Sequence, residues 1–219
     1  MRLLEYLYRS PLGRLMSVVA NMLARLQKPF MVYGYKDQTS GKFLKFTRVS
    51  SSALLMNPKR LSLGDNVWVW HYSILDATEG ISIGEGCQIG AWVGIFTHGS
   101  ENSIRLLGRQ FVHVSNVERI GYTRGAVSIG PYTFVGAGAI ILPGTTIGKG
   151  CLISAGALVS GQIPDYSVVA GNPVSINTVR TVDIDRRFFR RNDFSDTYYD
   201  ADALREIQAR LATKQVPHI

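Results

Sequence analysis

His98 is the side chain whose type and place in the chain most directly suggest acid–base chemistry. It stands in the stretch IFTHGSEN, where a regular apolar pattern gives way to a long polar segment, residues 99–126. The unperturbed pKa of histidine lies near neutrality, so an imidazole can both accept and return a proton at physiological pH. A lone histidine is more often a structural residue than a catalytic one, so on the residues alone His98 is a candidate for acid–base chemistry with a structural role as the alternative.

The polar segment, residues 99–126, interrupts an otherwise strict pattern and contains four arginines, two acids, His113 and two aromatic residues. Long loops in compact domains are usually functional or disordered, so this insertion is expected to serve the site beside His98. The sequence does not identify a residue that would orient the His98 imidazole, and two nearby carboxylates are considered for that place. Glu101 lies three residues after His98, and Glu79 lies about one coil earlier in the chain.

The regular pattern around the insertion has a period of six residues. Six residues turn a helix through about 600°, so members of the series would point about 120° apart and form no single face. On strands, a period of six is compatible with side chains that alternate every second residue. The series predicts short strands joined by tight bends, with these aliphatic side chains pointing inward: Ile129, Val135, Ile141, Ile147, Ile153 and Val159.

The same rhythm occurs before the insertion, with a two-residue bulge at 78–80. Its aliphatic positions are Leu63, Val69, Leu75, Ile83, Ile89 and Ile95. The position four residues after each aliphatic is small or apolar, except at Glu79, which the bulge displaces. Cys87 and Cys151 both occupy this position, as expected of buried structural cysteines. Twelve units at three per turn predict about four coils of a β-solenoid, and less regular units at 46–58 could add another.

The two ends of the chain are expected to be helical. Residues 10–28 begin with Ser10 as a cap and Pro11 at the first position, carry an apolar stripe, and end before Pro29. A second helix is expected at 202–214. These limits divide the chain into a helical and basic segment (1–45), the solenoid (46–179) and a C-terminal extension (180–219).

The positive charge is concentrated at the N-terminus, where residues 1–60 contain eleven Lys or Arg against two acids. The helix at 10–28 is too short and too charged to span a bilayer. It could lie on an anionic membrane surface or cap the open end of the solenoid. No signal peptide is recognised, and two cysteines suggest a reducing compartment. We expect a cytoplasmic protein, with membrane contact through residues 1–28. The run RRFFRRNDF is balanced by nearby acids, so nucleic-acid binding is not expected.

The stretch from Val127 to Ile176, with its ending PDYSVVAGNP, resembles the hexapeptide-repeat acyltransferases. Within that family the chain is similar to sugar O-acetyltransferases of the maltose, galactoside and nodulation type, and to those that modify O-antigen or capsule. The resemblance implies an all-β solenoid: a left-handed parallel β-helix with a long inserted loop and short flanking helices at both ends. It also implies a homotrimer, and a histidine just before the inserted loop as the catalytic base, which here is His98.

The same resemblance implies acetyl-CoA as acyl donor and a hydroxyl of a saccharide as acceptor, in a cell-surface polysaccharide or its precursor. The positions that match the family's CoA contacts are Phe134, Ala137, Ala155 and Ser160. Family members usually carry Lys or Arg soon after the GNP motif to meet the CoA phosphates, whereas this chain has Ser175 and Thr178 there. Either Arg180 or Lys149 would take that role, or the phosphates are held less tightly.

Three other readings are open. The acceptor could be a xenobiotic, a serine or an amino sugar, because the insertion sets the acceptor and its sequence does not identify one. A zinc lyase of the γ-carbonic-anhydrase type needs three histidine ligands per site, and the spacing of the four histidines disfavours it. No metal is therefore expected. A non-catalytic scaffold with the same fold is the third reading, and the presence of His98 speaks against it.

Overall fold

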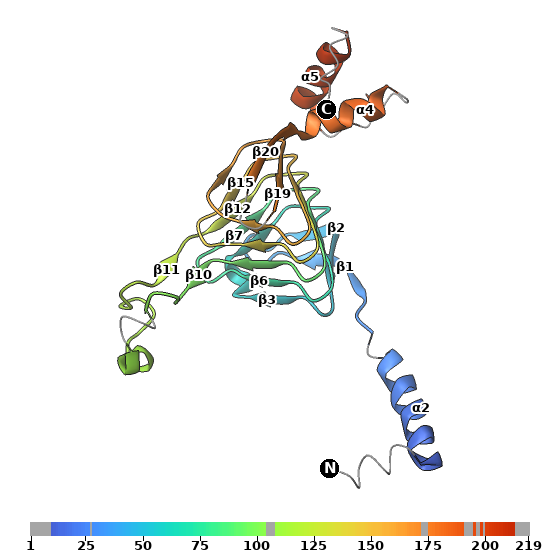
Figure 1. Cartoon of the computed structure of the whole chain (residues 1–219), viewed down its shortest axis with the longest axis vertical. Coiled ribbons are helices and arrows are strands. Elements are labelled where there is room, and N and C mark those ends of the chain that lie inside the picture. The colour runs from blue at the N-terminus through green and yellow to red at the C-terminus, as the bar shows by residue number, and fades with distance from the viewer. Residues whose placement is uncertain are drawn as a thin grey trace. The chain divides into compact units, whose positions relative to one another are not determined.

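The structure is a computed structural model that describes residues 10–26, 28–103, 108–171, 175–190, 195, 198 and 200–212. The chain forms two compact units, Met1–Phe30 and Met31–Ile219. In the second unit, short strands wind into stacked coils that have three faces, and each face is a sheet of mainly parallel strands (Figure 1). The predicted β-solenoid is confirmed, and the left-handed sense of its coil stays a prediction.

The strands of each face stack in parallel, one coil apart. The first face contains β2 (Phe43–Ser50), β5 (Trp68–Val69), β8 (Gln88–Ile89), β13 (Phe134–Val135), β16 (Leu152–Ile153) and β19 (Ser167–Ala170). The second contains β3 (Leu54–Met56), β6 (Ile74–Asp76), β9 (Gly94–Phe96), β14 (Ile140–Ile141) and β17 (Leu158–Val159). The third contains β4 (Leu61–Leu63), β7 (Ile81–Ile83), β12 (Val127–Ile129), β15 (Thr146–Ile147) and β18 (Gln162–Ile163).

The solenoid is longer than the four coils expected from the regular repeats. Among the described residues, two faces have five parallel strands and the first has six. The additional strands are β2 and β3 in residues 43–56, where the period is irregular, and β18 and β19 at the other end. Short sequence repeats are least regular at the ends of a stack, because terminal coils meet a neighbour on one side only.

The interior confirms the period-six interpretation. All twelve predicted aliphatic positions are buried, as are the cysteines in the small position of the repeat. Cys87 and Cys151 are free thiols, and burial raises the pKa of each to about 11. Several aliphatic residues of the repeat are followed by glycine, because the backbones of neighbouring coils lie too close together at these corners for a side chain. A Cβ on Gly130 would lie 2.5 Å from the backbone nitrogen of Lys149 on the next coil.

Antiparallel strands close the first face at both ends. The hairpin of β1 (Met31–Lys36) and β2 joins one edge, and β20 (Ser175–Arg180) pairs with β19 at the other. Because β1 pairs along its length with β2, residues 31–45 belong to the solenoid unit. The predicted boundary at residue 45 therefore differs from the division at Phe30. A 3-10 turn, η1 (Pro58–Arg60), precedes β4.

Helices occur at both ends of the chain. In the first unit α2 (Pro11–Leu26) has the predicted start, since the Ser10 hydroxyl accepts a hydrogen bond from Gly13 N at 3.2 Å. The predicted C-terminal helix is α5 (Ala201–Ala212), and α4 (Thr181–Phe189) was not anticipated. The two C-terminal helices share a small core with Tyr166 of the solenoid, formed by Val182, Ala203 and Ile207. In the described part of the chain, no helix has the length and apolar character needed to cross a membrane.

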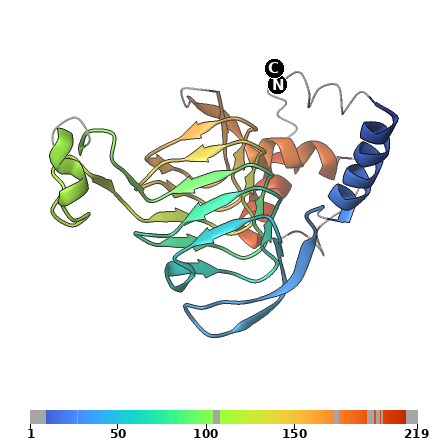
Figure 2. The same ribbon diagram turned by 90° about the horizontal axis from the view of Figure 1, so that it is seen from below.

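The insertion leaves the stack between the second and third faces. It departs through β10 (His98–Gly99), contains the 3-10 helix η2 (Gly108–His113), and returns through β11 (Thr123–Arg124). β10 and β11 form a two-stranded antiparallel ladder at its root, and both figures show the insertion projecting from the stacked coils (Figures 1 and 2). His98 therefore lies where the regular coil and the insertion meet.

Candidate active site

His98 is positioned by the coil that carries β9. This strand ends at Phe96, and the buried Thr97 then donates a hydrogen bond from Oγ1 to the Asp76 carbonyl at 2.7 Å. The next residue, His98, begins the ladder of the insertion and is about one quarter exposed. An imidazole at this corner is held by the coil below it and remains accessible from outside.

Asp76 is the acidic partner of His98. Its Oδ2 lies 3.0 Å from His98 Nδ1, and its side chain is almost fully buried. Nδ1 is also buried, and its contact with the carboxylate lacks the alignment of a hydrogen bond. Catalytic hydrogen bonds are often poorly aligned before substrate binds. A small turn of the imidazole would align the pair and leave Nε2 as the nitrogen that can exchange a proton with substrate.

The Asp76 carboxylate is itself held in place. Its Oδ1 accepts hydrogen bonds from the backbone nitrogen of Thr78 at 3.1 Å and from Thr78 Oγ1 at 2.6 Å. Asn57 Nδ2 in turn donates to Thr78 Oγ1 at 2.8 Å. These bonds satisfy one carboxylate oxygen and leave the other facing the imidazole, as an orienting residue requires.

The two carboxylates considered from the sequence, Glu101 and Glu79, have other partners in the structure. Glu101 Oε1 accepts a hydrogen bond from Thr123 Oγ1 at 2.5 Å, and Glu79 lies 3.8 Å from Arg124 in an ion pair. Asp76 was missed because its closeness to His98 follows only from the register between neighbouring coils. That register pairs Asp76 with Phe96 on the next coil, two residues before His98. A search one coil before His98 that included residues at strand ends would have found it.

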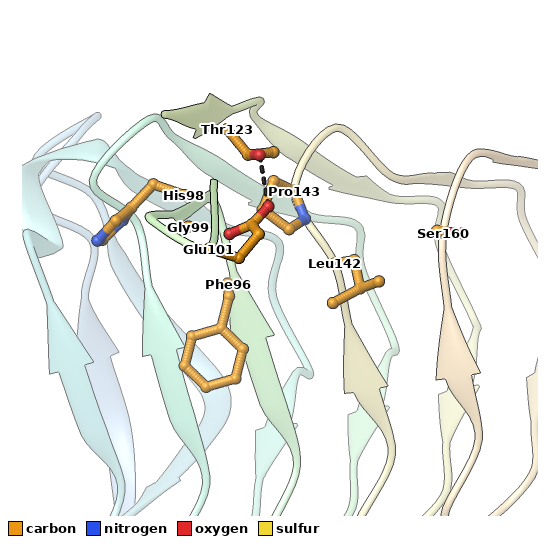
Figure 3. A pocket seen from close by; sticks show the side chains of 8 residues that line it. All are labelled: Phe96, His98, Gly99, Glu101, Thr123, Leu142, Pro143 and Ser160. Carbon is orange, nitrogen blue, oxygen red and sulfur yellow. Dashed lines mark hydrogen bonds between the residues drawn. The ribbon is translucent and has the colours of Figure 1, made fainter. Parts of the chain in front are cut away.

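A groove of about 520 Å³ runs along the same corner, and the side chains that line it are shown in Figure 3. One coil contributes Phe96 and His98, the next Leu142 and Pro143, and the third Ser160. Gly99, Glu101 and Thr123 add the root of the insertion. The groove is thus mainly apolar, with the candidate base at one end and a hydroxyl further along the stack.

The predicted CoA-contact positions fall in two different places within one chain. Ser160 lines the groove beside His98. Phe134 and Ala137 line a separate hollow of about 240 Å³, at the corner between the first and second faces, with Trp70 and Gln88. Ala155 is exposed on the following coil, where Gly156 N donates a hydrogen bond to the Ala137 carbonyl. The structure therefore brings Ser160, but not the other three positions, to the groove of His98.

Lys149 is engaged in a structural ion pair. Its Nζ lies 2.6 Å from Asp200 Oδ2 and 5.4 Å from the centre of the Tyr166 ring, and hydrogen bonds to Asp200 and Tyr166 raise its pKa. Burial opposes ionisation of Asp200, but hydrogen bonds from Ala203 N, Lys149 and Tyr166 lower its pKa to about 2. Binding a phosphate would require Lys149 to leave this pair. Arg180, the alternative candidate for a phosphate ligand, ends β20, where its backbone pairs with Ser167.

Two stretches of the chain match sequence models of hexapeptide repeats. Residues 126–161 match the model described as bacterial transferase hexapeptide (six repeats), and residues 75–96 match the hexapeptide repeat of succinyl-transferase. The resemblance to hexapeptide-repeat transferases is confirmed.

The described residues contain no group of three or more His, Cys, Asp or Glu arranged to hold a metal ion.

Curated relatives of this hexapeptide-repeat chain are acetyltransferases by name. A probable acetyltransferase of Mycobacterium tuberculosis is 31% identical over 118 residues, which cover 53% of this chain and 36% of the relative. A putative acetyltransferase of Saccharomyces cerevisiae is 32% identical over 116 residues, which cover 52% of this chain and 53% of the relative. The chain spans between about a third and about half of the length of these relatives.

Solved structures share the hexapeptide-repeat fold. A galactoside acetyltransferase in complex with coenzyme A superimposes with a TM-score of 0.51 at 22% identity, over 68% of this chain and 64% of that one. A hexapeptide-repeat acetyltransferase from Vibrio cholerae gives a TM-score of 0.50 at 21% identity, over 59% of this chain and 68% of that one. At these identities the likeness establishes the fold.

Proposed function

We propose that this protein transfers the acetyl group of acetyl-CoA to a hydroxyl of a saccharide, with His98 as general base. The observation that carries the proposal is the position of the His98 imidazole. It lies at one end of a mainly apolar groove, and the buried Asp76 carboxylate is 3.0 Å from its Nδ1. This arrangement suits a general base with an orienting acid, at a place where a substrate could reach the other ring nitrogen.

The residues of the groove fit an acyl thioester. Phe96, Leu142 and Pro143 offer apolar surface to an acetyl group and the adjoining chain of the donor, and Ser160 offers a hydroxyl further along the stack. Pockets for small molecules are commonly apolar with a few placed polar groups. The acyl donor would therefore lie along the corner of the coils, with its carbonyl carbon near His98.

His98 would act twice in the reaction. Its Nε2 takes the proton of the acceptor hydroxyl as the oxygen attacks the thioester carbonyl, and the Asp76 carboxylate stabilises the resulting imidazolium. The carbon–sulfur bond then breaks, and the imidazolium returns its proton to the departing sulfur. The products are an acetyl ester and free CoA thiol, and the imidazole is neutral again. A general base of this kind typically contributes about 10²- to 10⁴-fold in rate.

Three features support a saccharide acceptor, in a cell-surface polysaccharide or its precursor. The insertion places polar residues at the open side of the groove, including Glu101 and Thr123. A galactoside acetyltransferase shares the fold. The basic N-terminal region suits a location near an anionic membrane surface. We place the protein in the cytoplasm, where lipid-linked glycan precursors would be within reach.

The helix α2 is the proposed contact with the inner face of that membrane. Its apolar side chains Leu15, Met16 and Leu23 are 61%, 42% and 56% exposed, as required of an amphipathic helix that lies in the interface. Flotation with anionic liposomes tests this proposal. Deletion of residues 1–28 should abolish co-flotation, and unchanged flotation would contradict it.

A homotrimer would bring the two separated hollows together between neighbouring chains. The outward residues of the second face are apolar, with Leu54 and Ile74 exposed, whereas the third face carries a ladder of polar residues. That ladder consists of Ser62, Ser82, Ser128, Thr146 and Gln162. A large exposed apolar face marks an interaction surface, so the second face would meet another copy. Light scattering on the full chain measures the assembly, and a monomer in solution would overturn this part of the proposal.

The central test is release of CoA thiol from acetyl-CoA with a panel of saccharide acceptors. Acceptor-dependent release by the wild type, lost in a folded His98→Ala, supports the reaction and the base together. Xenobiotic, serine and amino-sugar acceptors in the same panel test the other acceptor classes. If acetyl-CoA does not bind at all by calorimetry, the transfer proposal is overturned in favour of a scaffold.

A further inference from the structure

We propose that Tyr122, on the insertion, is a positioning residue that fixes the plane of the His98 imidazole. The catalytic base would then be assembled from two parts of the chain, with Asp76 supplied by the solenoid and Tyr122 by the insertion. This inference rests on the proposed function, because it concerns how the same base is held.

The observation behind it is a ring stack at the root of the insertion. The centres of the His98 and Tyr122 rings lie 5.5 Å apart, and their planes differ by 20°. The ladder of β10 and β11 explains the contact, since His98 lies directly opposite Arg124. Tyr122 is two residues before Arg124 and so lies diagonally across from His98, a spacing within the reach of aromatic side chains.

The Tyr122 ring is in turn flanked by two arginines. The guanidinium of Arg119 lies 5.8 Å from its centre and that of Arg124 lies 5.0 Å away. Arg119 also donates hydrogen bonds to the carbonyls of Phe111 and Val114, at 3.2 and 3.1 Å. Arg124 lies 3.8 Å from Glu79 of the solenoid. These contacts tie Tyr122 to the fold of the insertion on one side and to the coils on the other.

The stack supplies a restraint that Asp76 alone does not. Asp76 contacts the imidazole at one edge, at Nδ1, and that contact lacks the alignment of a hydrogen bond. The ring could therefore turn about its Cβ–Cγ bond and carry Nε2 away from the acceptor hydroxyl. A flat ring against the face of the imidazole opposes that rotation. Misplacement of a catalytic group by about 1 Å can cost about 10²-fold in rate, so the restraint has a measurable effect.

The proposal predicts that the aromatic ring of Tyr122 matters and its hydroxyl does not. Tyr122→Leu should lower kcat at least about tenfold, whereas Tyr122→Phe should stay within about threefold of the wild type. The KM for acetyl-CoA should change little in both, because Tyr122 does not line the groove. Val117→Ala is the matched control, since Val117 is 81% exposed on the same insertion. This control should leave both constants unchanged.

The decisive readout is independent of turnover. Proton–nitrogen spectra of the imidazoles report ring-current shifts and tautomer, and the chain has only four histidines to assign. The His98 ring protons should carry a ring-current shift that persists in Tyr122→Phe and disappears in Tyr122→Leu. Asp76→Asn combined with Tyr122→Leu should be less harmful than the product of the two single effects, because both act on one ring.

The outcomes separate this inference from the proposed function. If His98→Ala abolishes turnover but Tyr122→Leu matches the wild type in kcat and in the His98 spectrum, the positioning role is overturned and the proposed function stands. If Tyr122→Phe is as impaired as Tyr122→Leu, the hydroxyl rather than the ring is required, and the proposal is again overturned. If His98→Ala retains full turnover, the proposed function itself fails.

Discussion

Asp76 Oδ2 lies 3.0 Å from His98 Nδ1, although 21 residues separate the two in the chain. The distance is short because each coil of the solenoid places a residue directly above one in the coil before it. The register pairs Asp76 with Phe96, so a carboxylate at the end of one strand faces the residues that follow the next. The stacking of β6 and β9 therefore brings the carboxylate of Asp76 next to the imidazole of His98.

Replacing Asp76 with asparagine should separate orientation from folding. The side chain keeps its shape and can still accept the Thr78 hydrogen bonds, but it no longer stabilises an imidazolium. We expect kcat to fall about 10- to 1,000-fold, with little change in thermal stability, as measured by CoA release and by melting.

Asp65→Asn is the matched control for that variant. Asp65 lies at another corner of the solenoid, where its Oδ1 accepts hydrogen bonds from the backbone nitrogens of Phe46, Thr47 and Asn66. It should lower the melting temperature without a comparable loss of kcat. Equal losses of kcat in both variants would mean that Asp76 acts through stability, which would contradict an orienting role.

The docking of the C-terminal helices should depend on Asp200. This residue caps α5 through a hydrogen bond from Ala203 N at 2.7 Å and pairs with Lys149. Removing an N-cap typically costs about 0.5 to 2 kcal/mol, so Asp200→Ala should increase hydrogen exchange in α4 and α5 while the coils stay protected. Lys149→Met removes the contacts of the ammonium group but leaves the N-cap in place, so it should have a smaller effect. Unchanged exchange in Asp200→Ala would contradict the assigned contact.

The ion pair of Lys149 and Asp200 predicts that the docking of the C-terminal helices weakens at acidic pH. The folded pKa of Asp200 is lowered to about 2, below its value of about 3.9 in an unfolded chain. Its contribution to stability is therefore complete above about pH 5 and is lost as the pH falls from about 4 towards 2. Hydrogen exchange or near-ultraviolet dichroism across this range should show weakened docking that is absent in Asp200→Asn. A wild type and variant with the same acid profile would refute it.

Much of the fold could be predicted from the sequence because one simple period repeats along it. Ile141 and Cys151 are buried where the six-residue spacing places them. The hairpin of β1 and the helix α4 were missed because no repeat marks them and only tertiary contacts define them. The additional coil around residues 46–58 was anticipated from its less regular units. Tyr166, for example, packs with Val182 and Ile207, a contact between segments with no shared pattern.

The site was predicted only in part, for a related reason. His98 stands out because it marks the interruption of the repeat. Asp76 and Tyr122 contact it through the coil register and through the ladder at the root of the insertion, neither of which the local sequence reveals. Lys149 was one of two candidates for a phosphate ligand, and the sequence does not show that Asp200 lies 2.6 Å from its Nζ.

Because neighbouring coils stack closely at their corners, adding one methyl group at Gly130 should lower the melting temperature strongly. Gly130→Ala would place a Cβ 2.5 Å from the Lys149 backbone nitrogen. The two coils would have to separate, so we expect a loss of several degrees in melting temperature at least. Overpacking typically costs about 1 to 3 kcal/mol. Ser128→Ala, at an exposed position two residues earlier, is the control and should melt like the wild type. Equal melting of Gly130→Ala and the wild type would contradict the corner packing.

Because both cysteine thiols are buried, we expect them to react slowly with thiol reagents in the folded protein. Burial raises the pKa of Cys87 and Cys151 to about 11, and the thiolate is the reactive form. A disulfide reagent at neutral pH should therefore modify neither cysteine in the native protein and both after unfolding. Rapid modification of the native protein would show that these coils open readily.

The measurement that tests the account most directly is acceptor-dependent release of CoA thiol by His98→Ala relative to the wild type. Both proteins must first be shown to be folded and to bind acetyl-CoA. We predict that the variant binds the donor normally and loses at least about 10²-fold in kcat. A variant that binds acetyl-CoA and transfers the acetyl group at the rate of the wild type would contradict the assignment of His98 as the base.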